Sequence, residues 1–212
     1  MSRSFHRSGL CLITGHGVSA VLRERVHNAS LEFFRQEQAV KDEFASREKG
    51  APGYMSMGQQ HLGQTLSAET LPADMNEFLI FSTGAEGHPS GIGASADGIA
   101  RTQDIAVVPT VPAELPQLFD DYTAAMDRLN SALMRVTATA LGQRAEYFQP
   151  FFTPGQYTLQ CRYYPAVLDE DFAPQPGQMR IGAHADSNGF TIVRLDGTCA
   201  INHLVHLKIA QK

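Results

Sequence analysis

His184 and Asp186 are the two residues of this sequence whose types and spacing best fit a metal centre. They directly follow Met179–Ala183, a segment predicted to be a strand. In extended backbone, side chains two positions apart point to the same face, so an imidazole and a carboxylate would stand side by side. Such a pair supplies two ligands of the 2-His-1-carboxylate triad, which holds Fe(II) and leaves coordination positions open. The alternative is a hydrogen-bonded His–Asp pair on a strand surface, with no metal.

Helices and short strands are predicted before this motif. Leu10–Thr14 is predicted to be a short buried strand, and Glu77–Ser82 another strand. A helix is expected from Ser19 to Ala45, with Ser19 as its N-cap. A second, longer helix is predicted because its apolar residues keep i, i+3, i+4 spacing: Leu115, Leu118, Tyr122, Met126, Leu129, Leu133 and Val136.

The hydrophobic pattern changes to a period of two in Gln156–Tyr164. One predicted face carries Tyr157, Leu159, Cys161 and Tyr163, and the other carries Thr158, Gln160, Arg162 and Tyr164. Met179–Ala183, Phe190–Leu195 and Ala200–Ile209 are predicted to be further strands. The expected fold class is therefore α+β, with helices leading into antiparallel strands.

Composition narrows the classes of function. The chain has 212 residues, a formal net charge of −5 and 43% hydrophobic residues, which predicts a globular core and argues against a nucleic-acid partner. No stretch approaches the roughly 20 apolar residues that span a bilayer, so no membrane partner is expected. The cysteines Cys11, Cys161 and Cys199 are far apart and odd in number, which favours a reduced, cytoplasmic compartment.

Gly15–Ala20 fits the dinucleotide-binding pattern G-x-G-x-x-G/A, between a predicted strand and a predicted helix. The pattern requires a second parallel strand after the helix, and the sequence offers no β-branched run there. The alternative is a turn in which glycine supplies unusual backbone angles. A dinucleotide-binding oxidoreductase therefore stays open as a lesser hypothesis.

Seven stretches resemble, in order, motifs of the non-haem Fe(II)- and 2-oxoglutarate-dependent oxygenases of the isopenicillin N synthase-like group. The resemblance covers nearly the whole chain, to about Gly197. Gly9–Val18 resembles the family's opening motif GFF-x-(V/I)-x-NHG-(V/I), with Gly15 where asparagine is usual. The stretches are Gly9–Val18, Glu32–Phe34, Gly53-Tyr54, Asp74–Phe78 (D-x-x-E-x-F), the helix Ala113–Leu141, Arg162–Pro165 (NYYP) and Arg180–Asp186 (x-IG-x-H-T-D).

This resemblance implies roles for individual residues. His184 and Asp186 would be two ligands of Fe(II), and Tyr164 would help to hold the cosubstrate 2-oxoglutarate. Arg162 stands where the family usually has asparagine, so it would either contact a carboxylate or be a solvated strand residue. No further catalytic residue is assigned. The implied reaction is oxidation of a small molecule coupled to decarboxylation of 2-oxoglutarate to succinate.

The resemblance also implies a division of the chain. Residues 1–110 would form the N-terminal region with its glycine-rich variable loop, 111–155 the long helix and connection, and 156–212 the first part of a jelly-roll (double-stranded β-helix) core. The family's second histidine ligand and its Arg-x-Ser lie further downstream, and residues 187–212 contain no Arg-x-Ser. His203 and His206 are the remaining candidates for the third ligand. The core is therefore expected to be incomplete, and the alternative to an active oxygenase is an inactive, truncated remnant that self-associates through unpaired strand edges.

Overall fold

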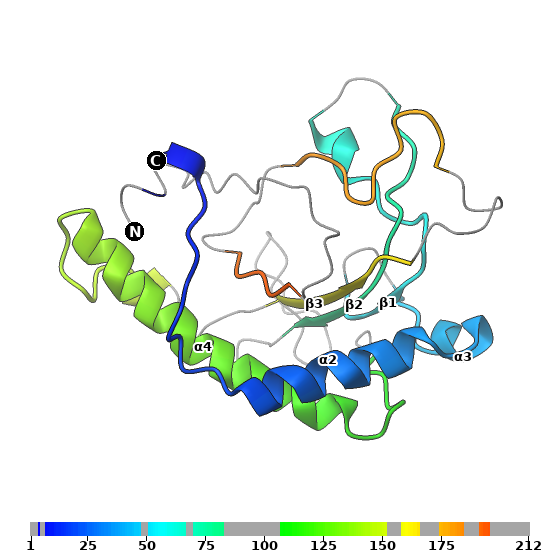
Figure 1. Cartoon of the computed structure of the whole chain (residues 1–212), viewed down its shortest axis with the longest axis horizontal. Helices are drawn as coiled ribbons and strands as arrows, with labels where there is room; N and C mark the ends of the chain where they lie inside the picture. Colours follow the sequence, from blue (N-terminus) through cyan, green and yellow to red (C-terminus); the bar gives the residue numbers. More distant parts are fainter. Residues whose placement is uncertain are drawn as a thin grey trace.

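Two long helices lie against one face of a small sheet in the computed structural model of the chain (Figure 1). The helices are drawn below the sheet in this view, and the loop segments 56–66 and 174–184 lie on its other side. The structure describes residues 4, 7–47, 51–66, 70–82, 107–151, 158–165, 174–184 and 191–195.

The first of these helices, α2 (Ala20–Phe34), begins where the sequence predicts. The Ser19 side chain accepts a hydrogen bond from the Leu22 backbone N–H at 3.4 Å, and so caps the first turn. The expected continuation to Ala45 is wrong, because the chain turns at residues 35–37 and a separate short helix follows, α3 (Gln38–Asp42). The turn lets the Lys41 ammonium reach back to the end of α2.

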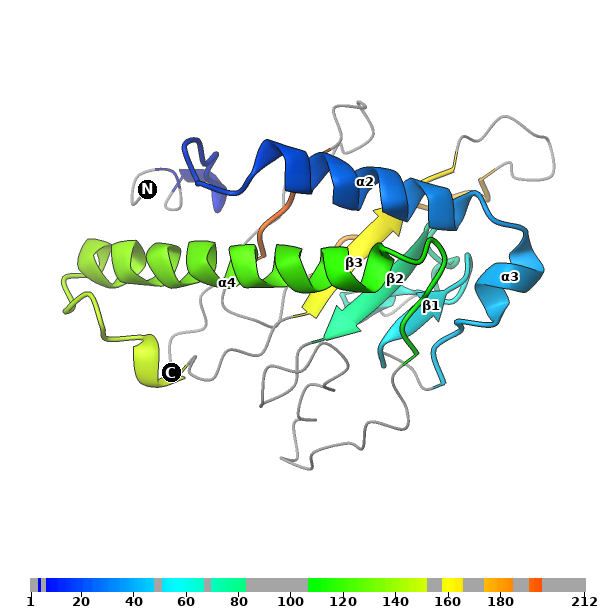
Figure 2. The same cartoon turned by 90° about the horizontal axis from the view of Figure 1, so that it is seen from below.

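The longest helix, α4 (Leu115–Ala140), confirms the prediction from periodicity. Its buried residues include Leu118, Phe119 and Tyr122, which belong to the main hydrophobic core. Helices α2 and α4 lie side by side across the sheet (Figure 2). Burial of this shared apolar stripe, rather than helix propensity alone, stabilises both helices.

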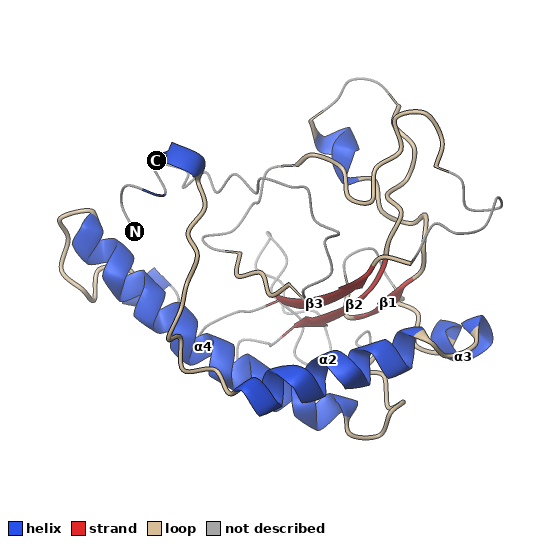
Figure 3. Cartoon of the chain, in the orientation of Figure 1, coloured by secondary structure: helices blue, strands red, loops and turns tan. Residues whose placement is uncertain are grey.

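The sheet has three antiparallel strands in the order β1-β2-β3 (Figure 3). They are β1 (Gly53–Met55), β2 (Glu77–Ser82) and β3 (Thr158–Tyr163). The central strand β2 has the bounds predicted from the sequence. Of the predicted strand Gln156–Tyr164, residues 156–157 lie outside the described residues, and β3 pairs with β2 in a register that places Cys161 opposite Leu79.

The two faces of the sheet differ in what covers them. Leu79 and Phe81 face the helices and join the main core, with Leu159, Cys161 and Tyr163 of β3 packed against it. Phe78 and Ile80 form a smaller cluster with Met55 on the opposite face. The predicted alternation along β3 is therefore confirmed, since Arg162 contacts Phe78 on that opposite face.

Three predicted strands differ from the structure. Leu10–Thr14 forms no strand and leaves Leu12 91% exposed, because no described segment lies beside it to complete a hydrogen-bonded ladder. Met179–Ala183 also forms no strand and instead bonds to residues 73–76 through single backbone and side-chain contacts. In Phe190–Leu195, residues 191–195 are described and form no strand. The predicted strand Ala200–Ile209 lies outside the described residues.

The glycine pattern at residues 15–20 does not open a dinucleotide fold. Gly15 and Gly17 have φ values of 65° and 74°, which are the turn angles expected of the alternative interpretation. No strand precedes α2 in the described chain, and the strands that follow it are antiparallel. Both requirements of the βαβ unit are therefore absent from the described residues.

Candidate metal and cosubstrate site

The candidate site lies on the face of the sheet away from the helices. Strand β3 and the residue after it carry Arg162 and Tyr164, and segment 174–184 carries His184. Figure 1 shows this segment beside the loop that contains the short 3-10 helix η1 (Leu62–Thr65). The structure therefore brings the predicted cosubstrate residue and one predicted metal ligand to the same side of the sheet.

Residues 73–76, just before β2, hold segment 174–184 in place. The Met75 N–H donates to the Met179 carbonyl oxygen at 2.9 Å. The side chain of Asn76 donates to the Arg180 carbonyl oxygen at 2.6 Å, and that of Gln178 donates to the Ala73 carbonyl oxygen at 2.8 Å. The segment is thus attached, through residues 178–180, to the residues that lead into the central strand of the sheet.

His184 is half-buried, and its Nδ1 lies 2.8 Å from the Gly182 carbonyl oxygen. A carbonyl oxygen only accepts hydrogen bonds, so Nδ1 is the donor in this contact, which corresponds to the Nδ1–H tautomer whenever the ring is uncharged. That tautomer suits a metal ligand that coordinates through Nε2. Asp186, His203 and His206 lie outside the described residues. Within the described ranges, no three His, Cys, Asp or Glu residues are close enough to hold a metal ion.

Arg162 donates hydrogen bonds to amide side chains around the candidate site. Its Nη1 donates to the Gln60 Oε1 at 2.6 Å and to the Asn76 Oδ1 at 2.8 Å, and its Nη2 donates to the Gln160 Oε1 at 2.6 Å. The guanidinium also lies over the Phe78 ring, 4.4 Å from its centroid. Burial lowers the pKa of Arg162 from its usual value. Among the described residues, Arg162 is therefore a partly buried cross-link of amide side chains.

The Tyr164 phenol lies among charged side chains of this site. Burial raises its pKa above the usual value, and the charge of Arg162 partly opposes that effect. Asp74 raises the pKa further and Arg180 lowers it, so both lie near the phenol. The net direction is upward, which keeps the hydroxyl protonated at neutral pH and able to donate a hydrogen bond.

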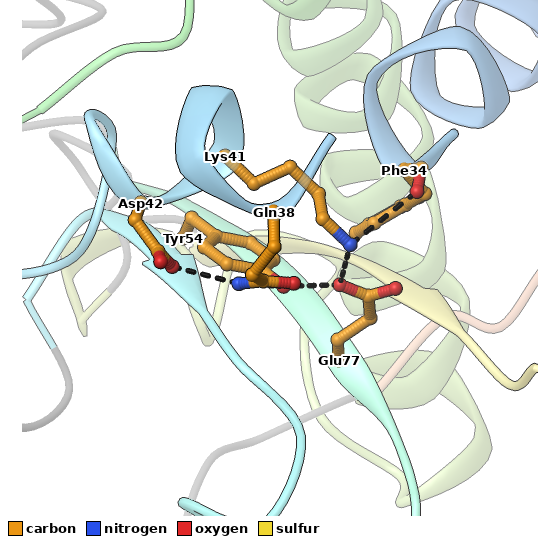
Figure 4. Close-up of polar contacts among 6 residues, drawn as sticks. All are labelled: Phe34, Gln38, Lys41, Asp42, Tyr54 and Glu77. Carbon is orange, nitrogen blue, oxygen red and sulfur yellow. Dashed lines mark hydrogen bonds and ion pairs between the residues drawn. The ribbon is translucent and has the colours of Figure 1, made fainter. Parts of the chain in front are cut away.

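A separate polar cluster lies on the helix face of the sheet (Figure 4). The ammonium of Lys41 lies 2.8 Å from the Glu77 carboxylate, and both side chains are only 8% exposed. The Tyr54 hydroxyl donates to the same Glu77 oxygen, and the Lys41 ammonium also donates to the Phe34 carbonyl oxygen at 3.4 Å. This cluster joins α3, the end of α2, β1 and β2, so its role is structural.

The environment of the Tyr54 hydroxyl predicts that the folded protein becomes less stable at alkaline pH. Burial, followed by its hydrogen bond to Glu77, raises the pKa of Tyr54 above the usual value. The unfolded chain therefore loses its tyrosine proton first, and the free energy of unfolding should fall as pH rises above about 10. Urea midpoints measured against pH should fall less steeply in Tyr54→Phe than in the unsubstituted chain. Equal slopes in the two proteins would contradict this assignment.

Sequence reasoning missed the residues that arrange the site. Asp74, Asn76 and Gln60 were assigned no role, although their contacts fix Arg162 and segment 174–184. The one available signal was the stretch Asp74–Phe78, which stands where the family motif D-x-x-E-x-F is common. Its members act on opposite faces of the sheet, with Asp74 and Asn76 at the candidate site and Glu77 in the helix-face cluster.

Comparison with known proteins identifies dioxygenases and oxidases as relatives of this chain. Residues 1–100 match the family model for the non-haem dioxygenase in morphine synthesis N-terminal region. Validamycin A dioxygenase of Streptomyces hygroscopicus subsp. limoneus is 29% identical over 195 residues, which cover 90% of this chain and 50% of that protein. Gibberellin 20 oxidase 1 of Oryza sativa subsp. japonica is 28% identical over 201 residues, covering 90% of this chain and 48% of the relative. The chain therefore spans about half the length of the curated relatives it matches.

Solved structures share the fold of this chain. A full-length Neurospora crassa protein, in complex with alpha-KG and thymine, matches with a TM-score of 0.63 and 23% identity, over 87% of this chain and 54% of that one. JOX2 in complex with 2OG, Fe and JA matches with a TM-score of 0.59 and 19% identity, over 78% of this chain and 44% of that one. The layer of helices and the small antiparallel sheet thus occur together in these larger proteins.

Proposed function

We propose that the chain belongs to the Fe(II)- and 2-oxoglutarate-dependent oxygenases and serves the oxidation of a small molecule with these two cofactors, as its family-model match and its relatives suggest. The observation that carries the proposal is the placement of Tyr164 and of the segment that carries His184 on the sheet face away from the helices, with the His184 Nδ1 proton directed to a backbone carbonyl.

His184 and Asp186 would hold the iron, and Tyr164 would donate a hydrogen bond to 2-oxoglutarate. When bound, iron and 2-oxoglutarate supply the oxidising chemistry. The chain's own residues would bind and orient these two groups. The Gly182 carbonyl holds the His184 ring in one tautomer, and the raised pKa of Tyr164 keeps its hydroxyl a donor. Phe78, which is buried beneath the Arg162 guanidinium, would exclude water from the surface of this face of the sheet.

The jelly-roll core belongs to the same proposal. Strand β3 would belong to that core, with residues 156–212 as its first portion after the N-terminal region 1–110, which contains β1 and β2, and the helical connection 111–155. Either His203 or His206 would serve as a third ligand if this chain completes the site alone. Self-association through strand edges and a cytoplasmic location stay predictions. No helix of the described chain is long and apolar enough to cross a membrane.

An anaerobic titration tests the function. Fe(II) and 2-oxoglutarate added together should produce a visible charge-transfer absorption, and admission of O₂ should yield succinate. His184→Ala should abolish the absorption because it removes one of two proposed ligands supplied by this chain. The matched control is His27→Ala, since His27 is half-buried on α2, in the helix layer.

The outcome separates the hypotheses. An absorption that survives in His184→Ala would contradict the assigned ligand. A folded, unsubstituted chain with no absorption and no succinate would contradict the oxygenase function and favour the alternative of an inactive remnant.

A further inference from the structure

We propose that Asp74 is a positioning residue, which fixes the iron ligand His184 through the backbone of Gly182. The inference rests on the proposed function for the identity of His184 as a ligand. The contact itself is a feature of the structure and connects residues 108 positions apart in the sequence.

The Asp74 carboxylate is buried and bonded to backbone N–H groups. The residue is 2% exposed. Its Oδ1 accepts from the Gly182 N–H at 2.8 Å, and its Oδ2 accepts from the Leu62 N–H at 3.0 Å. A buried carboxylate loses its hydration and is tolerated only when hydrogen bonds replace it. Asp74 therefore joins the loop at residue 62 and the segment that carries His184 to one rigid point beside the sheet.

Gly182 transmits this position to the histidine. Its N–H is held by Asp74, and its carbonyl oxygen accepts from the His184 Nδ1 at 2.8 Å. A Cβ at residue 182 would lie 2.3 Å from the Gly63 nitrogen and 2.6 Å from its Cα, so only glycine fits against that backbone. The residue whose carbonyl oxygen orients the imidazole is thus held by the carboxylate at its N–H and by close packing around its Cα.

Other contacts attach the segment, but they act on residues before Gly182. The Gln178 amide bonds to the Ala73 carbonyl oxygen, and Asn76 bonds to the Arg180 carbonyl oxygen. Both act before residue 182 in the chain. Removing Gln178 should loosen the start of the segment and leave the Asp74–Gly182–His184 connection intact, which makes Gln178 a matched control.

Asp74→Asn is the variant that separates positioning from simple attachment. Asparagine has the same size, but one of its two terminal atoms is an amide nitrogen that would face a backbone N–H, donor against donor. Loss of groups that orient a metal ligand typically weakens metal binding about 10–100-fold. We expect Asp74→Asn to raise the Fe(II) dissociation constant at least ~10-fold, and Gln178→Ala to change it far less.

The readout that does not need iron is the tautomer of His184. In ¹⁵N spectra of the metal-free chain in mildly alkaline buffer, His184 should show a protonated Nδ1, and Asp74→Asn should shift the ring toward a mixture of tautomers. Circular dichroism confirms that each protein is folded. If Asp74→Asn does not fold, Asp74→Glu decides, because it keeps the charge and moves the carboxylate; it should show the same two changes in milder form.

The results distinguish the positioning role of Asp74 from the proposed function. If His184→Ala abolishes Fe(II) binding and the Asp74 variants alter neither affinity nor tautomer, the positioning role is wrong and the proposed function stands. If His184→Ala leaves Fe(II) binding unchanged, the proposed function fails. A tautomer shift in Asp74→Asn would then still support the Asp74–Gly182–His184 connection, and its absence would overturn that as well.

Discussion

Replacing Glu77 with alanine is expected to lower the free energy of unfolding by about 3–5 kcal/mol, the usual cost of breaking a buried ion pair from one side. Glu77 accepts from the Lys41 ammonium at 2.8 Å and from the Tyr54 hydroxyl. Its removal leaves the Lys41 charge buried at 8% exposure, with the Phe34 carbonyl oxygen and the face of the Tyr54 ring as its contacts among the described residues. Urea unfolding followed by circular dichroism measures the change.

Two controls test the physical reason for this loss. The double variant Lys41→Met/Glu77→Leu removes both charges and should recover most of the stability lost in Glu77→Ala, because no unpaired charge stays buried. Glu146→Ala breaks the exposed pair with Arg135, whose Nη1–Oε1 distance is 3.1 Å, and should cost no more than about 1 kcal/mol. Equal losses of unfolding free energy in Glu77→Ala and Glu146→Ala would contradict the conclusion that the buried cluster contributes more to stability than an exposed ion pair.

Leu118→Ala is expected to cost about 2–5 kcal/mol of unfolding free energy, because it opens a cavity in the main core. Leu118 lies on α4, is 1% exposed and packs with the residues that join both helices to the sheet. The same measurement in urea applies, with the slope of the transition checked for a change in the unfolded state.

Leu12→Ala is the matched control, since it removes the same atoms from a side chain that is 91% exposed. Its expected effect is within about 0.5 kcal/mol, as for surface substitutions in general. A large loss in Leu12→Ala would mean that residues 10–14 pack as a buried strand in solution, as the sequence alone suggested. A small loss in Leu118→Ala would contradict the described core.

The predictable part of the fold rests on local patterns. The spacing of apolar residues in α4, the capping serine at the start of α2 and the alternation along β3 each depend on residues a few positions apart. Such patterns report which face of an element is buried. They therefore located the helices, the central strand and the two faces of β3 before any three-dimensional information.

The candidate site was predicted less completely. His184 and Tyr164 are proposed as site residues through resemblance to family motifs. Asp74 was quoted within a motif and had no role. Its partner Gly182 is 108 residues away, and no periodicity in one segment indicates a contact over that separation.

By itself, then, the sequence determined which segments are amphipathic, where α2 begins and which motifs the chain shares with its relatives. Only the tertiary structure decided which apolar segments become strands, because a strand exists only where a partner completes its hydrogen bonds. Leu10–Thr14 and Met179–Ala183 are extended and apolar enough for strands, yet form none. The structure likewise decided that a buried carboxylate holds the peptide beside His184, since burial creates the need for that hydrogen bond.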